Sequence, residues 1–309
     1  MKNTVEYYYN IKIANLIPEN NYYLFYFNND KFYLVLLDRP YQDLILLNKL
    51  VIELKNKGVI TSEIIFNIEN KLFSIINNQA YVLLKSSKYE NNAVTYNDIN
   101  YIQLNTYNIN YDKMLLRNNW VKLWSEKIDY YEYQMTELRR KYKILHNTID
   151  YYIGLGENAI LYIINNKEKL DIKNYVVSHK RINISNSTFE FFNPLSYVID
   201  SRVRDTAEFI KDSFFKDKIT LNEVFNILNY NNYSYSEYIL FISRLLFPSY
   251  YFDIYDEIVN NNLNENNIEK IVNKSSSYET FLNNIINYIY YEKRVFIDQI
   301  DWLKKDASY

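Results

Sequence analysis

Two polar residues near the middle of the chain are of the types that hold a divalent cation. Asp200 follows the apolar run Tyr197-Val-Ile, and a carboxylate at the end of a buried strand is the hard oxygen ligand that Mg²⁺ prefers. Asn186 offers a second oxygen. Such ligands would suit phosphoryl transfer, in which the protein positions the donor and stabilises spreading charge. Two plainer interpretations stay open: Asp200 caps the next turn, and Asn186 is one of many asparagines.

A third polar residue, Arg181, sets a limit on this chemistry. A guanidinium stays protonated at any working pH, so Arg181 cannot accept a proton from an acceptor hydroxyl. It could pair with Asp200, bind a phosphate or another anion, or be an ordinary solvated loop arginine. The residue types alone leave these alternatives open.

The order of these residues resembles the catalytic core of the kinase-like phosphotransferases, the aminoglycoside phosphotransferase and choline kinase group. That family's core reads His-Gly-Asp-Leu-His-x-x-Asn, then an apolar strand ending in Ile-Asp, then a short Asp-Leu-Ala helix. His179, Asn186 and Asp200 stand in register with it, and Asp205 in Arg204-Asp205-Thr-Ala opens the helix. Arg181 stands where the catalytic Asp is expected.

The resemblance assigns roles to these positions. It implies an architectural role for His179, which would hydrogen-bond backbone near the metal-binding Asp. It implies that Asn186 and Asp200 would bind the cofactor and hold the metal, ATP and Mg²⁺ being the cofactors of an active member. No residue is assigned as catalytic, because Arg181 replaces the expected base.

A lysine on a small-lobe strand is a further part of a kinase site. Here the strand Phe32-Tyr-Leu-Val-Leu-Leu is apolar where that lysine is expected, near Val35 and Leu36. Lys31 and Lys85 are the candidates to replace it. Asp43, on the helix that follows, could be the acidic partner of such a lysine.

Composition narrows the class of protein. The chain has 309 residues with 48% hydrophobic content and a net charge of −2, so it can bury a large core and has no global basic field for nucleic acid. It has no cysteine, which excludes disulfides and thiolate metal sites, and only 3 glycines, which form no phosphate-binding loop. The first residues lack the apolar core of a signal peptide, and no apolar run is long enough to span a membrane. We therefore expect a cytoplasmic protein.

Hydrophobic periodicity predicts an α+β protein, and the resemblance implies a two-lobed protein-kinase-like fold. The small lobe is an antiparallel sheet with one helix, and the larger lobe is mainly helical. The predicted boundaries are residues 1–88 for the small lobe, 89–105 for the linker and 106–309 for the large lobe. In the small lobe, strands are predicted at residues 22–27, 32–37, 63–68, 72–76 and 81–85, and a helix at 41–57 that ends at Gly58.

The large lobe is predicted from longer periodic segments. Short strands are expected at residues 175–177, 190–192 and 197–199. Helical segments are expected at residues 115–145, 151–164, 205–214, 221–228, 235–246, 251–260, 266–274 and 276–304. Gly154 and Gly156 lie in the second of these, where they would allow close packing. His146 is interpreted as a packing residue.

The resemblance is strongest to the spore-coat-associated kinase-like proteins of Firmicutes. It is carried by Trp120 and Trp124 on a long helix, by the segment Ile153-Gly-Leu-Gly-Glu-Asn-Ala-Ile, and by Ser178-His-Lys-Arg. It implies a spore-associated, degenerate kinase that acts by binding or scaffolding, with a protein or a small molecule as partner. Two alternatives stay open: an active small-molecule phosphotransferase using ATP and Mg²⁺, and a purely structural interaction protein with a vestigial cleft.

Overall fold

The computed structural model describes residues 1–19, 22–87, 93–138, 140–172 and 174–304. The chain forms two compact units, each assembled from separate stretches of sequence. The first unit is Met1–Arg117 with Asn174–Arg202, and the second is Asn118–Lys173 with Val203–Tyr309. The predicted lobe boundaries stay a prediction.

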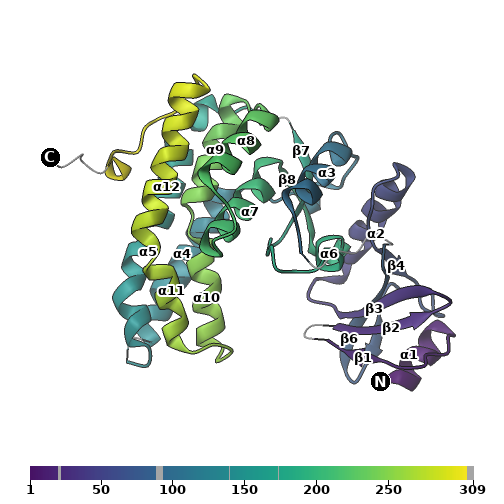
Figure 1. Cartoon of the computed structure of the whole chain (residues 1–309). Coiled ribbons are helices and arrows are strands. Elements are labelled where there is room, and N and C mark those ends of the chain that lie inside the picture. The colour runs from purple at the N-terminus through teal and green to yellow at the C-terminus, as the bar shows by residue number, and fades with distance from the viewer. Residues whose placement is uncertain (20–21, 88–92, 139, 173, 305–309) are drawn as a thin grey trace. The chain divides into compact units, whose positions relative to one another are not determined.

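The first unit contains an antiparallel sheet whose path is β1-β2-β3-β6-β4, with β5 paired to β6 (Figure 1). All of its pairings are antiparallel. The strands are β1 (Ile17–Pro18), β2 (Tyr22–Phe27), β3 (Asp30–Leu36), β4 (Glu63–Ile65), β5 (Ser74–Ile76) and β6 (Gln79–Lys85). The small antiparallel sheet predicted from the sequence is therefore confirmed, although β4 and β5 are shorter than predicted.

Asparagine makes the tight turns of this glycine-poor sheet. Asn28 and Asn29 join β2 to β3 with φ of 50° and 64°, and Asn77 and Asn78 join β5 to β6 with φ of 50° and 62°. Two-residue hairpin turns need positive φ, and asparagine tolerates it better than any residue but glycine. Both turns fall between strands that the sequence predicts, 22–27 with 32–37 and 72–76 with 81–85.

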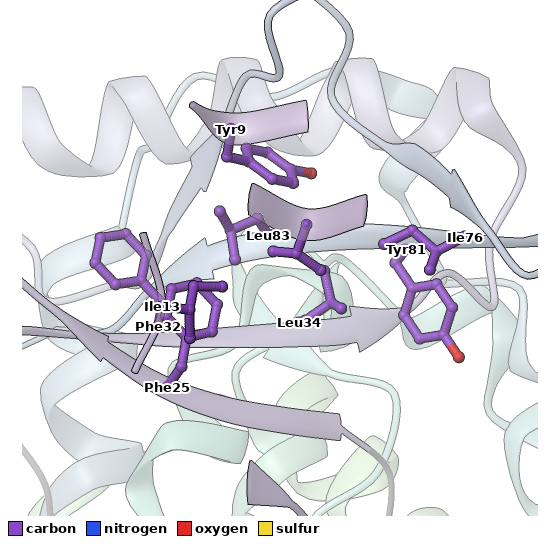
Figure 2. Packing of buried hydrophobic residues seen from close by; sticks show 9 residues of the cluster. Tyr9, Ile13, Phe25, Phe32, Leu34, Ile76, Tyr81 and Leu83 are labelled. Atoms are coloured by element: carbon purple, nitrogen blue, oxygen red, sulfur yellow. The ribbon is translucent and has the colours of Figure 1, made fainter. Parts of the chain in front are cut away.

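Alternation along the strands gives the sheet two apolar faces. Phe32 and Leu34 point to one face, where they join Tyr9 and Ile13 from the N-terminal region (Figure 2). Helix α1 (Lys2–Tyr9), which the sequence did not predict, supplies this cover. Tyr33 points to the opposite face, which belongs to a different cluster.

Helix α2 (Tyr41–Asn56) packs on that opposite face through Leu44. It ends at Gly58, whose φ is +72° and whose N–H donates to the Lys55 carbonyl at 2.9 Å. A left-handed residue there satisfies the last helical carbonyls. The predicted glycine stop of this helix is confirmed.

The rest of the first unit is a hairpin with short helices around it. Strands β7 (Tyr175–His179) and β8 (Tyr197–Ser201) pair antiparallel, and α3 (Tyr96–Thr106), α6 (Thr188–Phe191) and the 3₁₀ turns η1 (Lys113–Leu115) and η3 (Pro194–Ser196) lie in the same unit. Val177 N–H donates to the Thr106 hydroxyl at 3.0 Å and so ties β7 to α3. Residues 190–192 were predicted as a strand, which is wrong: Glu190 and Phe191 belong to α6.

The second unit is helical. Its main helices are α4 (Trp120–Leu138), α5 (Lys143–Asn165), α7 (Val203–Phe215), α8 (Leu221–Asn231), α9 (Tyr235–Leu246), α10 (Ser249–Val259), α11 (Glu269–Val272) and α12 (Ser275–Asn287). Short turns η2 (Lys167–Lys169), η4 (Glu265–Ile268), η5 (Tyr288–Glu292) and η6 (Asp301–Leu303) complete it. Gly156 of α5 faces α4 so closely that a Cβ would lie 2.6 Å from Ile128 Cδ1. The predicted close packing holds for Gly156, whereas a Cβ at Gly154 would meet nothing within 4 Å.

Two helix predictions need correction. The segment 115–145 is not one helix, because α4 ends at Leu138 and α5 begins at Lys143. The segment 276–304 is not one helix: α12 ends at Asn287, η5 ends at Glu292, Arg294 adopts a left-handed φ of 55°, and the short 3₁₀ turn η6 follows at Asp301–Leu303. Helix α3 fills most of the predicted linker 89–105, of which residues 89–92 lie outside the described residues. Its capping box, in which Thr95 N–H donates to Asp98 at 2.8 Å, was a sequence signal that could have revealed it.

A buried ionic network stabilises the second unit. The Glu208 carboxylate contacts Lys211 at 2.9 Å and Arg244 at 2.6 Å through Oε1, and Ser249 at 2.9 Å through Oε2. The Arg244 guanidinium also lies over the Trp120 ring, 4.9 Å from its centroid. Burial lowers the pKa of Lys211 to about 8, against the opposing attraction of Glu208. Lys211, Arg244 and Ser249 are themselves buried, so we interpret this network as structural.

Candidate functional site

Asp200 lies in β8 opposite Val176 of β7 and is completely buried. Its Oδ1 accepts a hydrogen bond from the N–H of Ser201 at 2.7 Å. This bond lies within β8. A magnesium ion needs open oxygen positions and usually keeps several waters, and a wholly buried carboxylate bonded to its own chain does not offer them. As they stand, these residues do not fit a bound magnesium ion.

His179 ends β7 and is buried among aromatic rings. Its Nε2 lies 2.8 Å from the Phe191 carbonyl oxygen, which can only accept, so this nitrogen carries the proton. The imidazole stacks on the Phe191 ring at 4.1 Å and meets the edge of Tyr197 at 5.4 Å. These contacts hold α6 against the β7–β8 hairpin, which fits the architectural role.

Arg181 and Asn186 lie in the loop after β7. Arg181 is exposed, and its Nη1 donates to the Lys180 carbonyl at 3.3 Å. Asn186 is half-buried in a turn, where its N–H donates to the Asn183 carbonyl at 3.0 Å. The roles of these residues stay a prediction.

The sheet face expected to carry the kinase lysine is filled with apolar side chains. Val35 packs against a buried cluster that includes Tyr33 of β3, Phe189 of α6 and Leu195 of η3. The Phe189 ring stacks on Tyr33 with centroids 3.3 Å apart and meets the edge of Tyr22 at 5.2 Å. The segment between β7 and β8 therefore packs Phe189 and Leu195 against this face, beside a groove that Tyr22, Val35 and Leu195 also line. Sequence reasoning did not foresee this use of Phe189.

The lysines proposed as substitutes lie elsewhere. Lys85 is at the end of β6, where its Nζ pairs with Asp30 at 2.5 Å. The Lys31 ammonium lies 5.1 Å from the Tyr33 ring centroid. Neither of these two contacts involves Asp43.

Arg39 is a cation that lies close to Asp43, and this contact was not predicted from the sequence. Arg39 comes shortly after β3 in the chain, and its Nη2 donates to the Tyr197 carbonyl at 2.6 Å. Nη1 lies 3.9 Å from Asp43 Oδ2, and Arg117 Nη2 is 3.9 Å from the same oxygen. The four-residue spacing of Arg39 and Asp43, across the start of α2, was the available signal.

Lys180 joins this group from the other side. It stands where the family pattern has glycine, and its Nζ contacts Asp38 Oδ2 at 3.0 Å. Burial and the neighbouring Arg39 charge lower the pKa of Lys180, while Asp38 opposes that shift. Burial also lowers the pKa of Arg39, with Asp43 and Asp38 opposing. Both cations are thus attracted by the carboxylates of Asp38 and Asp43. Lys180 and Asp38 also line a groove of about 520 Å³.

The described residues contain no group of three or more His, Cys, Asp or Glu side chains placed to hold a metal ion. His146 lies on α5 beside Glu132 and Asp150 in a second hollow. Among the described helices, none has the length and apolar character to cross a bilayer.

Comparisons with known proteins agree with this architecture. The family model described as spore coat putative kinase YutH matches residues 2–285. The endospore coat-associated protein YutH of Bacillus subtilis (strain 168) is 27% identical over 215 residues, which are 61% of this chain and 62% of that protein. The match thus spans less than two thirds of the length of that relative.

Solved structures share the fold at low identity. An aminoglycoside phosphotransferase from Alicyclobacillus acidocaldarius superposes with a TM-score of 0.66 at 10% identity, covering 94% of this chain and 96% of that one. A spectinomycin phosphotransferase solved with ADP and spectinomycin gives 0.56 at 13%, covering 87% and 91%. A choline/ethanolamine kinase family protein from Mesorhizobium loti gives 0.52 at 7%, covering 90% and 93%. The predicted kinase-like α+β fold is confirmed.

Proposed function

Since the chain belongs to the family of the spore coat putative kinase YutH, we propose that it is a kinase-like protein that acts by binding or scaffolding and transfers no phosphoryl group. The observation that carries this proposal is the apolar packing on one sheet face: Phe189 stacks on Tyr33 beneath β3. In kinases this strand carries the lysine that faces the donor phosphates. Phe189 and Leu195 cover part of that face, and the groove beside them is lined by Val35 and Leu36 of β3, which offer no cation to a donor phosphate.

The loop chemistry supports the same conclusion. A phosphoryl acceptor needs a group that can take its proton, and the side chain at the expected position, Arg181, is a permanent cation. The carboxylate expected to bind the metal, Asp200, is closed inside β8 and bonded to Ser201. We derive no step through magnesium for this chain.

An active phosphotransferase remains the alternative, and Asp200 with Asn186 is its support. It predicts Mg²⁺-dependent binding of ATP that is lost in Asp200→Ala. The third possibility is an interaction protein with a vestigial cleft. Like our proposal, it involves no phosphoryl transfer, but the protein would bind its partners through surfaces outside the cleft.

The cellular setting is also proposed from similarity. The Bacillus subtilis relative is named as endospore coat-associated, and we extend this association to the present protein, with a cytoplasmic site of synthesis and action. Its partner would be a protein or a small molecule.

Two measurements on the purified full chain test the proposal. The first is transfer of labelled phosphate from ATP with Mg²⁺, to the protein itself and to small hydroxylated or amino-sugar acceptors, for which we expect no turnover above a no-protein control. The second is a thermal-shift titration with ATP in Mg²⁺ and in EDTA. A ligand that binds only the native state raises the free energy of unfolding by about 2.7 kcal/mol when it is present at a hundredfold excess over Kd. We expect ATP to cause no such Mg²⁺-dependent shift of the unfolding midpoint.

Asp200→Asn serves as the matched variant, because it removes the charge and keeps the size of the side chain. Robust ATP-dependent phosphorylation that this variant abolishes would refute the proposal and establish the alternative.

A further inference from the structure

Helix α5 carries an exposed stripe that lies outside the core of its unit. Asp150, Gly154, Glu157, Leu161 and Ile164 follow one another at spacings of four and three residues. Such spacing places all five on one face of a helix, and it is the spacing of the contact positions in a coiled coil. None of the five is buried, and all belong to the second unit. We call these five residues the α5 stripe.

Two large apolar side chains form a ridge at the C-terminal end of the α5 stripe. Leu161 is 52% exposed and Ile164 is 45% exposed. The buried face of the same helix has its own apolar residues, among them Ile160 and Ile163. A single exposed leucine is ordinary in a folded protein, whereas two apolar side chains one turn apart make a continuous apolar surface that can dock.

A hollow of about 580 Å³ opens toward the other end of the stripe, beside Gly154. Its apolar lining includes Met135 of α4 and Ile149 and Ile153 of α5. A Cβ added at Gly154 would meet no atom within 4 Å, so the glycine leaves open space in this wall. The hollow can therefore accept an apolar side chain from outside.

The ridge and the hollow are complementary when two α5 helices lie antiparallel. Gly154 and Ile164 are about 15 Å apart along the helix, at 1.5 Å per residue. With a two-fold axis midway between them, Ile164 of each copy faces Gly154 of the other, and Leu161 of each copy faces Glu157 of the other. This is side-chain packing of the knobs-into-holes kind. A two-fold contact makes every such interaction twice.

Charge is complementary in the same arrangement. Asp150 is exposed on the lining of the hollow, and Lys167 and Lys169 are exposed just after α5 ends. Asp150 lies about as far from the axis on one side as these two lysines lie on the other, so the antiparallel pair brings them together. Glu168 stands between the lysines, and the segment keeps one net positive charge.

We propose that the α5 stripe joins two copies of this chain in an antiparallel, two-fold dimer, with Ile164 of each copy seated in the hollow beside Gly154 of the other. The occupant is a second copy because the ridge and the hollow lie on one face of one helix, so an antiparallel copy satisfies both at once. The contact uses only the second unit. It requires neither a nucleotide nor a phosphoryl transfer.

The test is sedimentation velocity of the full chain over a range of concentrations, in EDTA and without nucleotide. We expect a reversible monomer–dimer equilibrium. Ile164→Ala should weaken dimerisation by about tenfold or more, because the two-fold symmetry removes the contact twice. Leu123→Ala is the matched control, since Leu123 of α4 is 42% exposed and lies off the α5 stripe; it should leave the dimer unchanged.

Three further variants test the geometry. Gly154→Leu fills the hollow and should abolish the dimer, while the circular dichroism stays that of the wild type because the added side chain enters open space. Glu157→Leu extends the apolar ridge and should tighten the dimer several-fold. Because the chain has no cysteine, Leu161→Cys introduces a single thiol through which a short bismaleimide should link two copies. The same reagent should not link copies of Leu123→Cys.

A chain that stays monomeric at every concentration would overturn the inference. So would a dimer that Ile164→Ala weakens no more than Leu123→Ala does, one that Gly154→Leu leaves intact, or one that Glu157→Leu weakens. Equal cross-linking at the two introduced thiols would overturn the antiparallel arrangement. These outcomes say nothing about phosphoryl transfer, so the inference and the proposed function can fail separately.

Discussion

Replacement of Phe189 by alanine tests the packing on which the functional argument depends. Phe189 is 1% exposed, and its ring is sandwiched against Tyr33 and the edge of Tyr22. Phenylalanine-to-alanine changes in cores cost about 3–5 kcal/mol, through lost transfer energy and the cavity left behind. At roughly 2–4 °C per kcal/mol for a domain of this size, the unfolding midpoint should fall by about 6–20 °C.

The assay is thermal and urea unfolding followed by tyrosine fluorescence and circular dichroism. Phe66→Ala is the control, because Phe66 belongs to the same unit and is 47% exposed, so we expect a change within about 0.5 kcal/mol. A dry apolar cavity binds benzene. Saturating benzene should therefore recover part of the midpoint in Phe189→Ala and leave the wild type unchanged.

A loss in Phe189→Ala no larger than that of the Phe66 control would refute the reasoning. It would mean that the ring does not fill the face beneath β3, and the argument against a nucleotide there would lose its main support. A large loss with benzene rescue would establish that the protein's own side chain covers this part of the face.

Three further predictions concern the second unit. Glu208→Gln removes the carboxylate that contacts the buried cations Lys211 and Arg244 and should lower the free energy of unfolding by about 3–5 kcal/mol. Glu157→Gln on the exposed face of α5 should change it little, and urea titration separates the two. Gly156→Ala places a methyl group against Ile128 and should cost about 1–3 kcal/mol, a loss that Gly154→Ala, with open space around it, should not show. Burial raises the pKa of Tyr152 to about 12, so above pH 10 the unfolded state releases a proton that the folded state retains. The free energy of unfolding should therefore fall by about 1.4 kcal/mol per pH unit because of this group. Urea midpoints of the wild type should decline more steeply from pH 10 to 11.5 than those of Tyr152→Phe.

Local sequence signals determined much of the fold. The asparagine pairs at 28–29 and 77–78 fixed two hairpins, because few residues other than glycine tolerate positive φ. Gly58 marked the end of α2. Helix α9, at Tyr235–Leu246, lies where its apolar spacing predicted it. Such features depend on a few consecutive residues, so the sequence carries them directly.

Elements that depend on contacts with residues distant in the sequence were predicted less accurately. The short segment at residues 190–192 has the aromatic residues of a strand, yet it lies in and after α6, where Phe191 meets the ring of His179. The chain turns between Leu138 and Lys143 so that α4 and α5 pack on each other, and the continuous apolar period across that turn concealed it. Tertiary packing outweighed local pattern in both places.

The sequence by itself also located the candidate site residues, because the spacing of His179, Asn186 and Asp200 survives in one stretch of chain. Only the tertiary structure decided what surrounds them. The packing of Phe189 on Tyr33 and the hydrogen bond from Arg39 to the Tyr197 carbonyl join residues from separate segments. Burial and electrostatic compensation depend on every atom nearby, and no one-dimensional pattern records which atoms those will be.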